Sequence, residues 1–501
     1  MGNRSSRSSI NNATRPDDEA SPNGLDEWEL SFVEQTVNRA SIASALKQNK
    51  LRSRNWVPTL CSSRRNRVNA ERIHKLSMVK CFVEGRASVE QLETLVREAT
   101  NLQNLRLETH GYIHGQQDTL GAMARLLTAA SETPHTALES LTLSTMGKPL
   151  RGPVGAQLGH LLECNRGLTE LHLNLTAGDA DTKLIQHIAQ GLQCHDSVKL
   201  LSLTSCAIHD DEFAALLAPA LHSMTNLEAL DISSNKLTQE SLPVITSLLN
   251  SKDRRLEYLD ISGQKIFKNV KPQHVASFIK ALKRAERMEY LAVNSCHMND
   301  EVATPMIQML TSSDASRLQQ VDFGFNKFGH ATFDTLMTLL PQMKHVLKLK
   351  IHGAKVSTWS TQWTKDDSWL LLQALAQNQS IHCLSIDSNL FSSKECFGTL
   401  EAILRRNFLL EKAKRVRDEP LAGSSSSPPN AIPVAFIPHL LARIYDPSSL
   451  ERKAGHTVNH ELFQMIRYEW MPYMCNDSNP PKSPAPAKTT RRTKSSTPIV
   501  S

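Results

Sequence analysis

Four copies of one short apolar template follow one another between Leu227 and Phe328. They read LEALDISSNKL, LEYLDISGQKI, MEYLAVNSCHM and LQQVDFGFNKF, and they begin at Leu227, Leu256, Met288 and Leu318. In each copy apolar residues occupy positions one, four, six and eleven, and a small or amide residue tends to occupy position nine. Chance is a poor explanation for repetition at this density, which predicts a chain built from stacked copies of one structural unit.

The template is that of a short strand followed by a turn. Positions four and six lie two residues apart, so both side chains enter the core while positions three and five face solvent. We expect the amides at position nine, Asn235, Gln264 and Asn326, to bond backbone groups left open where the strand ends. Cys206 and Cys296 occupy the same position, and we interpret them as buried structural thiols rather than redox groups.

Weaker copies extend the template on both sides. They begin at Leu102, Leu138, Leu168, Val198, Val346 and Ile381, so that successive copies start 28 to 36 residues apart. A helical pattern follows each strand and is clearest between Asp210 and Asn226, where apolar residues recur at helical spacing and Asp210 is the expected helix cap. Each unit is too small to bury its own apolar face, and stacking removes that problem.

Residues 100–410 thus carry the pattern L-x-x-L-x-L-x-x-N/C-x-L and resemble the ribonuclease-inhibitor type of leucine-rich repeat proteins. The resemblance implies an α/β fold, a leucine-rich repeat solenoid with parallel strands on its concave face and helices on its convex face. Lys148 and Gly178 depart from it, because they stand where the eleventh residue should be apolar. The resemblance implies little about function, since this architecture serves many unrelated tasks.

Composition bounds the remaining possibilities. The 501 residues include nine cysteines without a C-x-x-C pair, which favours a reducing compartment over a secreted disulfide framework. The net charge of +7 is modest for this length and does not by itself indicate a nucleic-acid partner. No apolar run reaches 18 residues, so a transmembrane helix is not expected.

Six segments follow from the pattern in chain order. We expect a disordered tail (1–24), a helical and basic N-terminal capping region (25–100), the solenoid (101–416), a linker (417–431), a small helical element (432–475) and a disordered basic tail (476–501). Within the capping region, apolar residues from Trp28 to Leu46 lie close to helical spacing and predict a helix.

The N-terminus fits a lipidation signal. Met1-Gly2 followed by Asn3-Arg4-Ser5-Ser6 resembles the N-myristoylation pattern, with Gly2 as the acceptor. One myristoyl chain binds membranes only marginally, but ten basic residues against one acid between Lys47 and Lys80 could supply a second attraction to anionic lipid. The alternative is a solvated basic face on a capping region. Nucleic-acid binding is not expected, because aromatic residues are not interleaved with this charge apart from Trp56, and no helix-turn-helix or RNP-like motif appears.

No catalytic signature accompanies the repeats. Phosphate-binding, dinucleotide-binding, zinc-protease and serine-hydrolase motifs are all missing, so we expect no enzyme activity, no cofactor and no small-molecule substrate. His110 and His114 are four residues apart, but a metal site needs three or four ligands, and we predict none here.

The concave face is the candidate site. Its outward positions bring together three carboxylates, two tyrosines and, on the next strand, two lysines: Asp231, Tyr258, Asp260, Tyr290, Asp322, Lys348 and Lys350. Rigid aromatic residues with a polar fringe are typical of protein interfaces, although acidic residues could also serve only to keep the sheet soluble.

The sequence therefore predicts a non-enzymatic scaffold or adaptor in the cytoplasm that binds a protein partner, with attachment to an anionic membrane surface if Gly2 is acylated. Two alternatives stay open. One is a regulator of catalysis, such as the GTPase-activating proteins built on this type of repeat. The other is an effector secreted into a host cell.

Overall fold

The chain divides into two compact units, residues 1–363 with 385–387, and residues 364–384 with 388–501. The computed structural model describes residues 28–33, 36–37, 39–52, 72–108, 117–133, 138–145, 154–175, 182–193, 195–251, 255–313, 317–352, 365–386 and 394–418. Several expected features lie outside these ranges, namely both tails with Gly2, most of the basic segment, the His110–His114 pair, nearly all of the linker and the 432–475 element.

One parallel sheet runs through the first unit in chain order. Its strands are β1 (Trp28–Val33), β3 (Ile73–Val79), β5 (Asn104–Glu108), β6 (Ser140–Ser144), β7 (Glu170–Asn174), β8 (Leu200–Thr204), β9 (Ala229–Asp231), β10 (Tyr258–Asp260), β11 (Tyr290–Ala292), β12 (Gln320–Asp322) and β13 (Lys348–Lys350). From β6 to β13 each strand begins at position three of its template copy, so the predicted register is confirmed.

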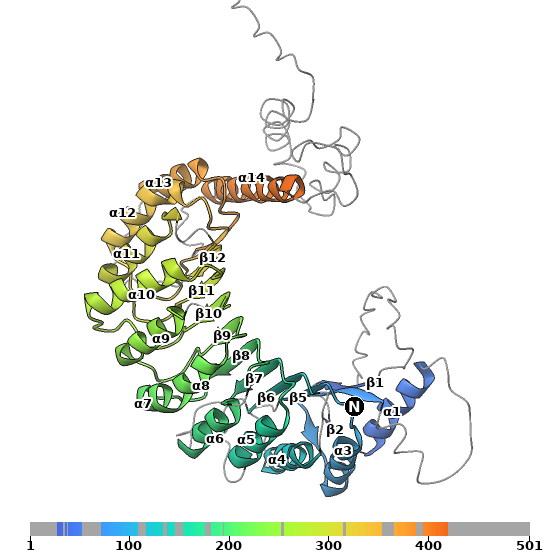
Figure 1. Ribbon diagram of the computed structural model, residues 1–501. Coiled ribbons are helices and arrows are strands. Elements are labelled where there is room, and N and C mark those ends of the chain that lie inside the picture. The colour runs from blue at the N-terminus through green and yellow to red at the C-terminus, as the bar shows by residue number, and fades with distance from the viewer. Residues whose placement is uncertain are drawn as a thin grey trace, which may run out of the picture. The chain divides into compact units, whose positions relative to one another are not determined.

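Helices cover one side of this sheet and leave the other open (Figure 1). They are α3 (Arg86–Glu98), α4 (Gln117–Glu132), α5 (Val154–Cys164), α6 (Thr182–Leu192), α7 (Asp210–Glu212), the π-helical turn Phe213–Leu217, α8 (Ala218–Ser223), the 3₁₀ turn Gln239–Ser241, α9 (Leu242–Leu249), α10 (Pro272–Arg284), α11 (Asp300–Met309), α12 (His330–Leu339) and the 3₁₀ turn Leu340–Gln342. The first unit is an α/β leucine-rich repeat solenoid with strands on its concave face and helices on its convex face. The ribonuclease-inhibitor subtype stays a prediction.

The core consists of the apolar template positions. At position four a row of side chains, each no more than 2% exposed, runs from strand to strand: Leu141, Leu171, Leu201, Leu230, Leu259, Leu291, Val321 and Leu349. Neighbours in this row are register partners, as Leu259 is of both Leu230 and Leu291. Truncating one such buried leucine to alanine typically costs about 2–5 kcal/mol of stability.

The ninth positions form a hydrogen-bonded ladder beneath the turns. The Asn326 amide donates to the carbonyls of Val293 (2.8 Å) and Phe323 (2.9 Å), and its oxygen accepts from the N–H groups of Cys296 (2.9 Å) and Met298 (3.1 Å). Asn235 and Gln264 likewise donate to backbone carbonyls of their own copy and the preceding one. The predicted role of the position-nine amides is confirmed.

The backbone differs in the two copies that carry a cysteine at position nine. In the five described copies from Val198 to Phe328, position eight is left-handed, at Ser205, Ser234, Gly263, Ser295 and Phe325. Within these five copies, position ten is left-handed only after the two cysteines, at Ala207 (φ 56°) and His297 (φ 59°). A thiol lacks the amide's acceptor oxygen. In the Cys296 copy the Cys296 carbonyl accepts from the N–H of Phe267, position twelve of the preceding copy, at 3.1 Å. The amide oxygens of Asn235, Gln264 and Asn326 accept from position eleven instead.

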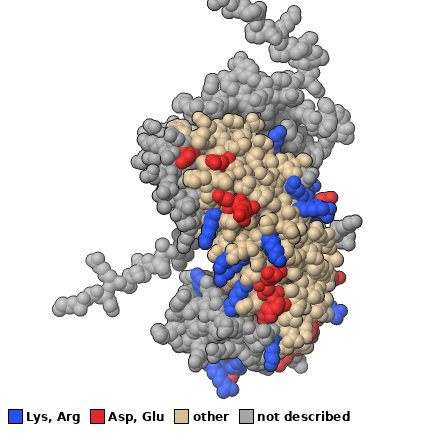
Figure 2. All heavy atoms as spheres, turned by 90° about the vertical axis from the view of Figure 1, so that its left-hand side faces the viewer, with Lys and Arg blue, Asp and Glu red and all other residues tan. Residues whose placement is uncertain are grey.

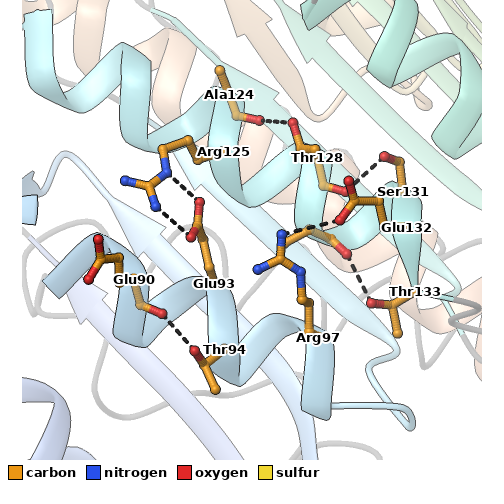
Figure 3. Close-up of polar contacts among 11 residues, drawn as sticks. Glu90, Glu93, Thr94, Arg97, Ala124, Arg125, Thr128, Ser131, Glu132 and Thr133 are labelled. Atoms are coloured by element: carbon orange, nitrogen blue, oxygen red, sulfur yellow. Dashed lines mark hydrogen bonds and ion pairs between the residues drawn. The ribbon is translucent and has the colours of Figure 1, made fainter. Parts of the chain in front are cut away.

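Arginine and glutamate side chains connect the helices near the N-terminal end (Figure 3). Arg125 of α4 binds both carboxylate oxygens of Glu93 on α3, one of them at 2.7 Å, and Arg97 reaches Glu132 at 3.2 Å. The Glu93 side chain is only 9% exposed, so its charge needs this paired guanidinium.

The capping region differs from the predicted helix. Residues 28–33 form strand β1, which pairs in parallel with β3, and the helix α1 begins only at Arg39 (Arg39–Arg52). Leu30 and Phe32 alternate into the core at 0% and 1% exposure, which is the period of a strand. A small second sheet joins β2 (Thr36–Val37) to β4 (Phe82–Val83).

The expected capping role of Asp210 is also wrong. Asp210 is the first residue of α7, and the backbone N–H of His209 is bonded by Glu212 (2.9 Å). The Asp210 carboxylate instead accepts from the Thr238 N–H (2.8 Å) and hydroxyl (2.7 Å), one repeat further on. Asp210 therefore bonds the residue that precedes the 3₁₀ turn of the next repeat, and it links the two repeats.

The second unit contains helices α13 (Lys365–Gln377) and α14 (Lys394–Asp418) and most of strand β14 (Cys383–Ser385). Asn407 is fully buried and donates to the carbonyls of Asn378 (3.0 Å) and Ile381 (2.8 Å), which ties α14 to the turn after α13. None of the helices in the described ranges of either unit combines the length and hydrophobicity needed to cross a bilayer.

Candidate partner-binding face

The predicted residues lie side by side on the open face of the sheet. Tyr258 of β10 is the register partner of Ala229 on β9 and of Tyr290 on β11, and Asp260 is the partner of Asp231. Asp322 of β12 is likewise the partner of Lys350 on β13. The structure thus brings all seven predicted residues onto five consecutive strands.

The two tyrosines form a stacked pair. Their ring centroids are 4.3 Å apart and the ring planes differ by 2°. Both side chains are half-buried, and burial raises the pKa of each hydroxyl, with the Asp260 carboxylate adding to the effect. The hydroxyls therefore stay protonated at neutral pH, and the pair presents a rigid, uncharged aromatic surface.

Hydrogen bonds from neighbouring strands and turns hold the carboxylates in place. Asp231 accepts from the Ser233 N–H (2.9 Å) and from the Thr204 hydroxyl (3.0 Å), and Asp260 accepts from the Ser262 N–H (2.8 Å). Burial raises the pKa of the Asp260 carboxyl, the bonds from Ser262 oppose this, and the charge of Asp231 adds to it.

Asp322 differs from the other two aspartates. It is only 7% exposed, forms an ion pair with Lys350 (3.2 Å) and accepts from the Gly324 N–H (3.0 Å). Its charge is therefore compensated within the sheet. In contrast, neither Asp231 nor Asp260 forms an ion pair within the part of the chain that the structure describes.

An acidic row that was not predicted lies at the start of the same strands. Position two of three consecutive copies is a glutamate: Glu228, Glu257 and Glu289. Glu228 pairs with Lys199 at 3.6 Å, and all three side chains are at least partly exposed. Because all three glutamates occupy position two of the template, the row could have been found from the sequence.

A second feature of this face lies nearer the N-terminal end. A depression of about 420 Å³ is lined mainly by polar residues: Glu29, His74, Lys75, Gln103, Asn104, Glu139, Ser140, Thr169 and Glu170. Lys75 and Glu29 form an ion pair at 2.9 Å within it. Among the described residues, no group of three His, Cys, Asp or Glu side chains is arranged to hold a metal ion.

The side of the molecule shown in Figure 2 has a different charge pattern. Basic and acidic side chains lie there in small mixed groups, and neither sign covers a large area. On this side, no single-sign patch marks a candidate binding surface.

Neither a family model nor a curated protein matches this chain. Solved structures with a similar trace include a tropomodulin C-terminal domain from Caenorhabditis elegans, with 17% identity over 35% of this chain and 98% of that chain and a TM-score of 0.29. A structure titled leiomodin-1 actin-binding site 2 matches at 16% identity over 30% of this chain and 81% of that chain, with a TM-score of 0.26. An internalin from Listeria monocytogenes matches at 15% identity over 62% of this chain and 88% of that chain, with a TM-score of 0.35. Similarity this low extends no property of these proteins to this chain.

Proposed function

We propose that this protein is a non-enzymatic scaffold or adaptor that holds a protein partner on the concave face of its solenoid. The stacked, half-buried tyrosine pair supports this proposal most directly. Tyrosine supplies a large contact area at low cost in side-chain entropy and is enriched at interface hot spots. The surrounding carboxylates and lysines would orient the partner by charge.

Affinity purification from cells that express the protein tests this function. We expect the double substitution Asp260→Lys with Tyr290→Ala to remove at least one co-purifying protein, because it reverses a charge and deletes half of the stack. Glu170→Lys with His172→Ala, on β7 of the same face, is the matched control. If the β10–β11 double variant retains every partner, the concave face from β9 to β13 is not the binding surface.

We further propose that myristoylation of Gly2 tethers the protein to anionic membranes, together with the basic residues between Lys47 and Lys80. The M-G-x-x-x-[ST] pattern supports this. Intact-mass spectrometry of the N-terminal peptide should show an added myristoyl group, and Gly2→Ala should abolish it. A free or acetylated terminus would remove the tether.

A further inference from the structure

Each ring of the stacked tyrosine pair has one face against its partner and one outer face that points away from it. The geometry of the pair determines where the outer faces point. A centroid separation of 4.3 Å is close to the spacing of neighbouring strands, about 4.8 Å, so the ring planes stand across the direction from strand to strand. The outer face of Tyr258 is therefore turned toward β9, and the outer face of Tyr290 toward β12.

The two outer faces have different surroundings. Beside Tyr258 stands Ala229, whose side chain ends at Cβ and is too short to cover an aromatic ring. The next side chain in this row is Leu200 on β8, two strand spacings or about 10 Å away. Beside Tyr290 stands the longer Gln320, followed by Lys348.

Charge distinguishes the two sides in the same way. Asp231 and Asp260 lie two residues further along β9 and β10, and Glu228 and Glu257 precede the same strands. Of these four carboxylates, only Glu228 has an ion-pair partner in the part of the chain that the structure describes. On the Tyr290 side, Lys348 would repel a cation, and Lys350 already neutralises Asp322.

We propose that the Tyr258 ring face above Ala229 receives an arginine side chain from an extended basic segment of the protein partner. The guanidinium stacks on the ring, and its N–H groups donate to the carboxylates of Asp231 and Asp260. This proposal rests on the proposed function and names the chemistry of the partner.

Arginine fits this place better than other side chains. Its planar guanidinium stacks on aromatic rings, is weakly hydrated and carries five donors that match carboxylates. The lysine ammonium is a strongly hydrated point charge that does not stack. An acidic segment would meet four carboxylates, and an apolar side chain would leave Asp231 and Asp260 desolvated without a counter-charge.

A defined peptide tests the proposal on the full chain. The probe is a fluorescein-labelled nonapeptide of alternating glycine and arginine, with lysine and glutamate versions as comparisons and fluorescence anisotropy as the readout. We expect the arginine peptide to bind at least about threefold more tightly than the lysine peptide, and the glutamate peptide not to bind. Equal binding of the arginine and lysine peptides, or no binding of the arginine peptide, would overturn the proposal.

Substitutions locate the binding on the protein. Tyr258→Ala removes the ring and Ala229→Leu covers it, and each should weaken binding of the arginine peptide about 3- to 30-fold. Tyr258→Phe keeps the ring and should stay within about twofold. Thr142→Leu on β6 and Glu170→Gln on β7 are matched controls on the same face, and they should also stay within about twofold. If Ala229→Leu and Tyr258→Ala bind like the controls, arginine is not held at this ring.

The two proposals can fail separately. If the Asp260→Lys, Tyr290→Ala protein loses cellular partners while no variant affects peptide binding, the face binds proteins but not through an arginine at Tyr258. If the peptide binds at Tyr258 while the Asp260→Lys, Tyr290→Ala protein retains every cellular partner, the arginine site exists but the cellular partners are not held on the concave face.

Discussion

At the scale of single residues, the charge of the Asp260 carboxylate lowers the stability of the fold at neutral pH. Burial raises its pKa above the ordinary value of 3.8, and the charges of Asp231 and Asp322 act in the same direction. A carboxyl with a raised pKa in the folded state stabilises the fold while it is protonated, and this contribution is lost as the pH rises through the raised pKa. At neutral pH the ionised carboxylate therefore costs stability.

Asp260→Asn should relieve that cost. Its amide oxygen can still accept the Ser262 N–H, so we expect the variant to melt at a higher temperature than the parent at pH 7. The difference should shrink as the pH falls toward 3.8, where the parent carboxyl is also protonated. Thermal melts of both proteins between pH 4 and pH 7, followed by circular dichroism, measure this. A difference in melting temperature that does not change with pH would contradict the assigned cause.

The cysteines give a second test at this scale. Cys206 and Cys296 are fully buried, and burial raises the pKa of each thiol to about 12, so almost no thiolate forms at pH 8. Cys164 and Cys383 are exposed. Brief iodoacetamide treatment of the native chain should modify Cys164 and Cys383, and Cys206 and Cys296 only after unfolding, as mass spectrometry of the peptides will show. Rapid native labelling at Cys296 would contradict a structural role.

At the scale of elements, two helical glycines have different surroundings. One lies where two helices approach closely, and the other lies in open space. A Cβ at Gly191 on α6 would lie 2.7 Å from the Leu162 Cβ and 2.9 Å from the Gly159 carbonyl oxygen, both on α5. Gly121 on α4 has no neighbouring atom within 4 Å of such a Cβ. Gly191→Ala should therefore destabilise the protein by about 1–3 kcal/mol. Gly121→Ala should stabilise it by about 0.5–1 kcal/mol. Urea denaturation measures both, and equal signs would refute the close approach of α5 and α6.

The sequence predicted those elements whose side chains repeat with one period. Leu230 and Ile232 fix a strand, and Asn235 fixes the turn after it, because the same positions recur in the neighbouring copies. Strand β1 was missed because Trp28 and Phe32 also lie four residues apart, and this spacing suits a helix as well as a strand. The role of Asp210 was missed because its partner, Thr238, belongs to the next repeat. Local sequence does not show which neighbour a carboxylate will cap.

The residues of the candidate face could be predicted from the sequence, but the contacts between their side chains could not. Alternation along the strands placed Tyr258, Tyr290, Asp231 and Asp260 on one surface, and parallel register brought them together. The neutralisation of Asp322 by Lys350 depends on rotamers that no periodicity encodes. The same limit applies to the ring stacking, which is a property of two side chains rather than of a pattern.

At the scale of the whole molecule, the stack couples each repeat mainly to its neighbours, and Asn326 offers a test of that coupling. Its fully buried amide satisfies backbone groups of two adjacent repeats. Asn326→Ala leaves several of them without a partner, at about 1–3 kcal/mol for each buried orphan group. We expect an overall loss of about 2–5 kcal/mol of stability.

The stability lost in the Asn326→Ala protein should accelerate amide hydrogen exchange only in the repeats next to Asn326. In a nearly one-dimensional stack, hydrogen exchange in the Asn326→Ala protein should accelerate at Cys296, at Met298 and in strands β11 and β12, whereas β5 to β7 should exchange as in the parent. Asn226→Ala is the matched control, because that exposed amide makes one bond to the Asp196 carbonyl at 3.0 Å and its removal should leave all strands unchanged. Mass spectrometry of exchanged peptides measures both. Uniform acceleration from β3 to β13 would mean that the first unit opens as one cooperative body, because the free energy that binds neighbouring repeats would then exceed the cost of unfolding any one of them.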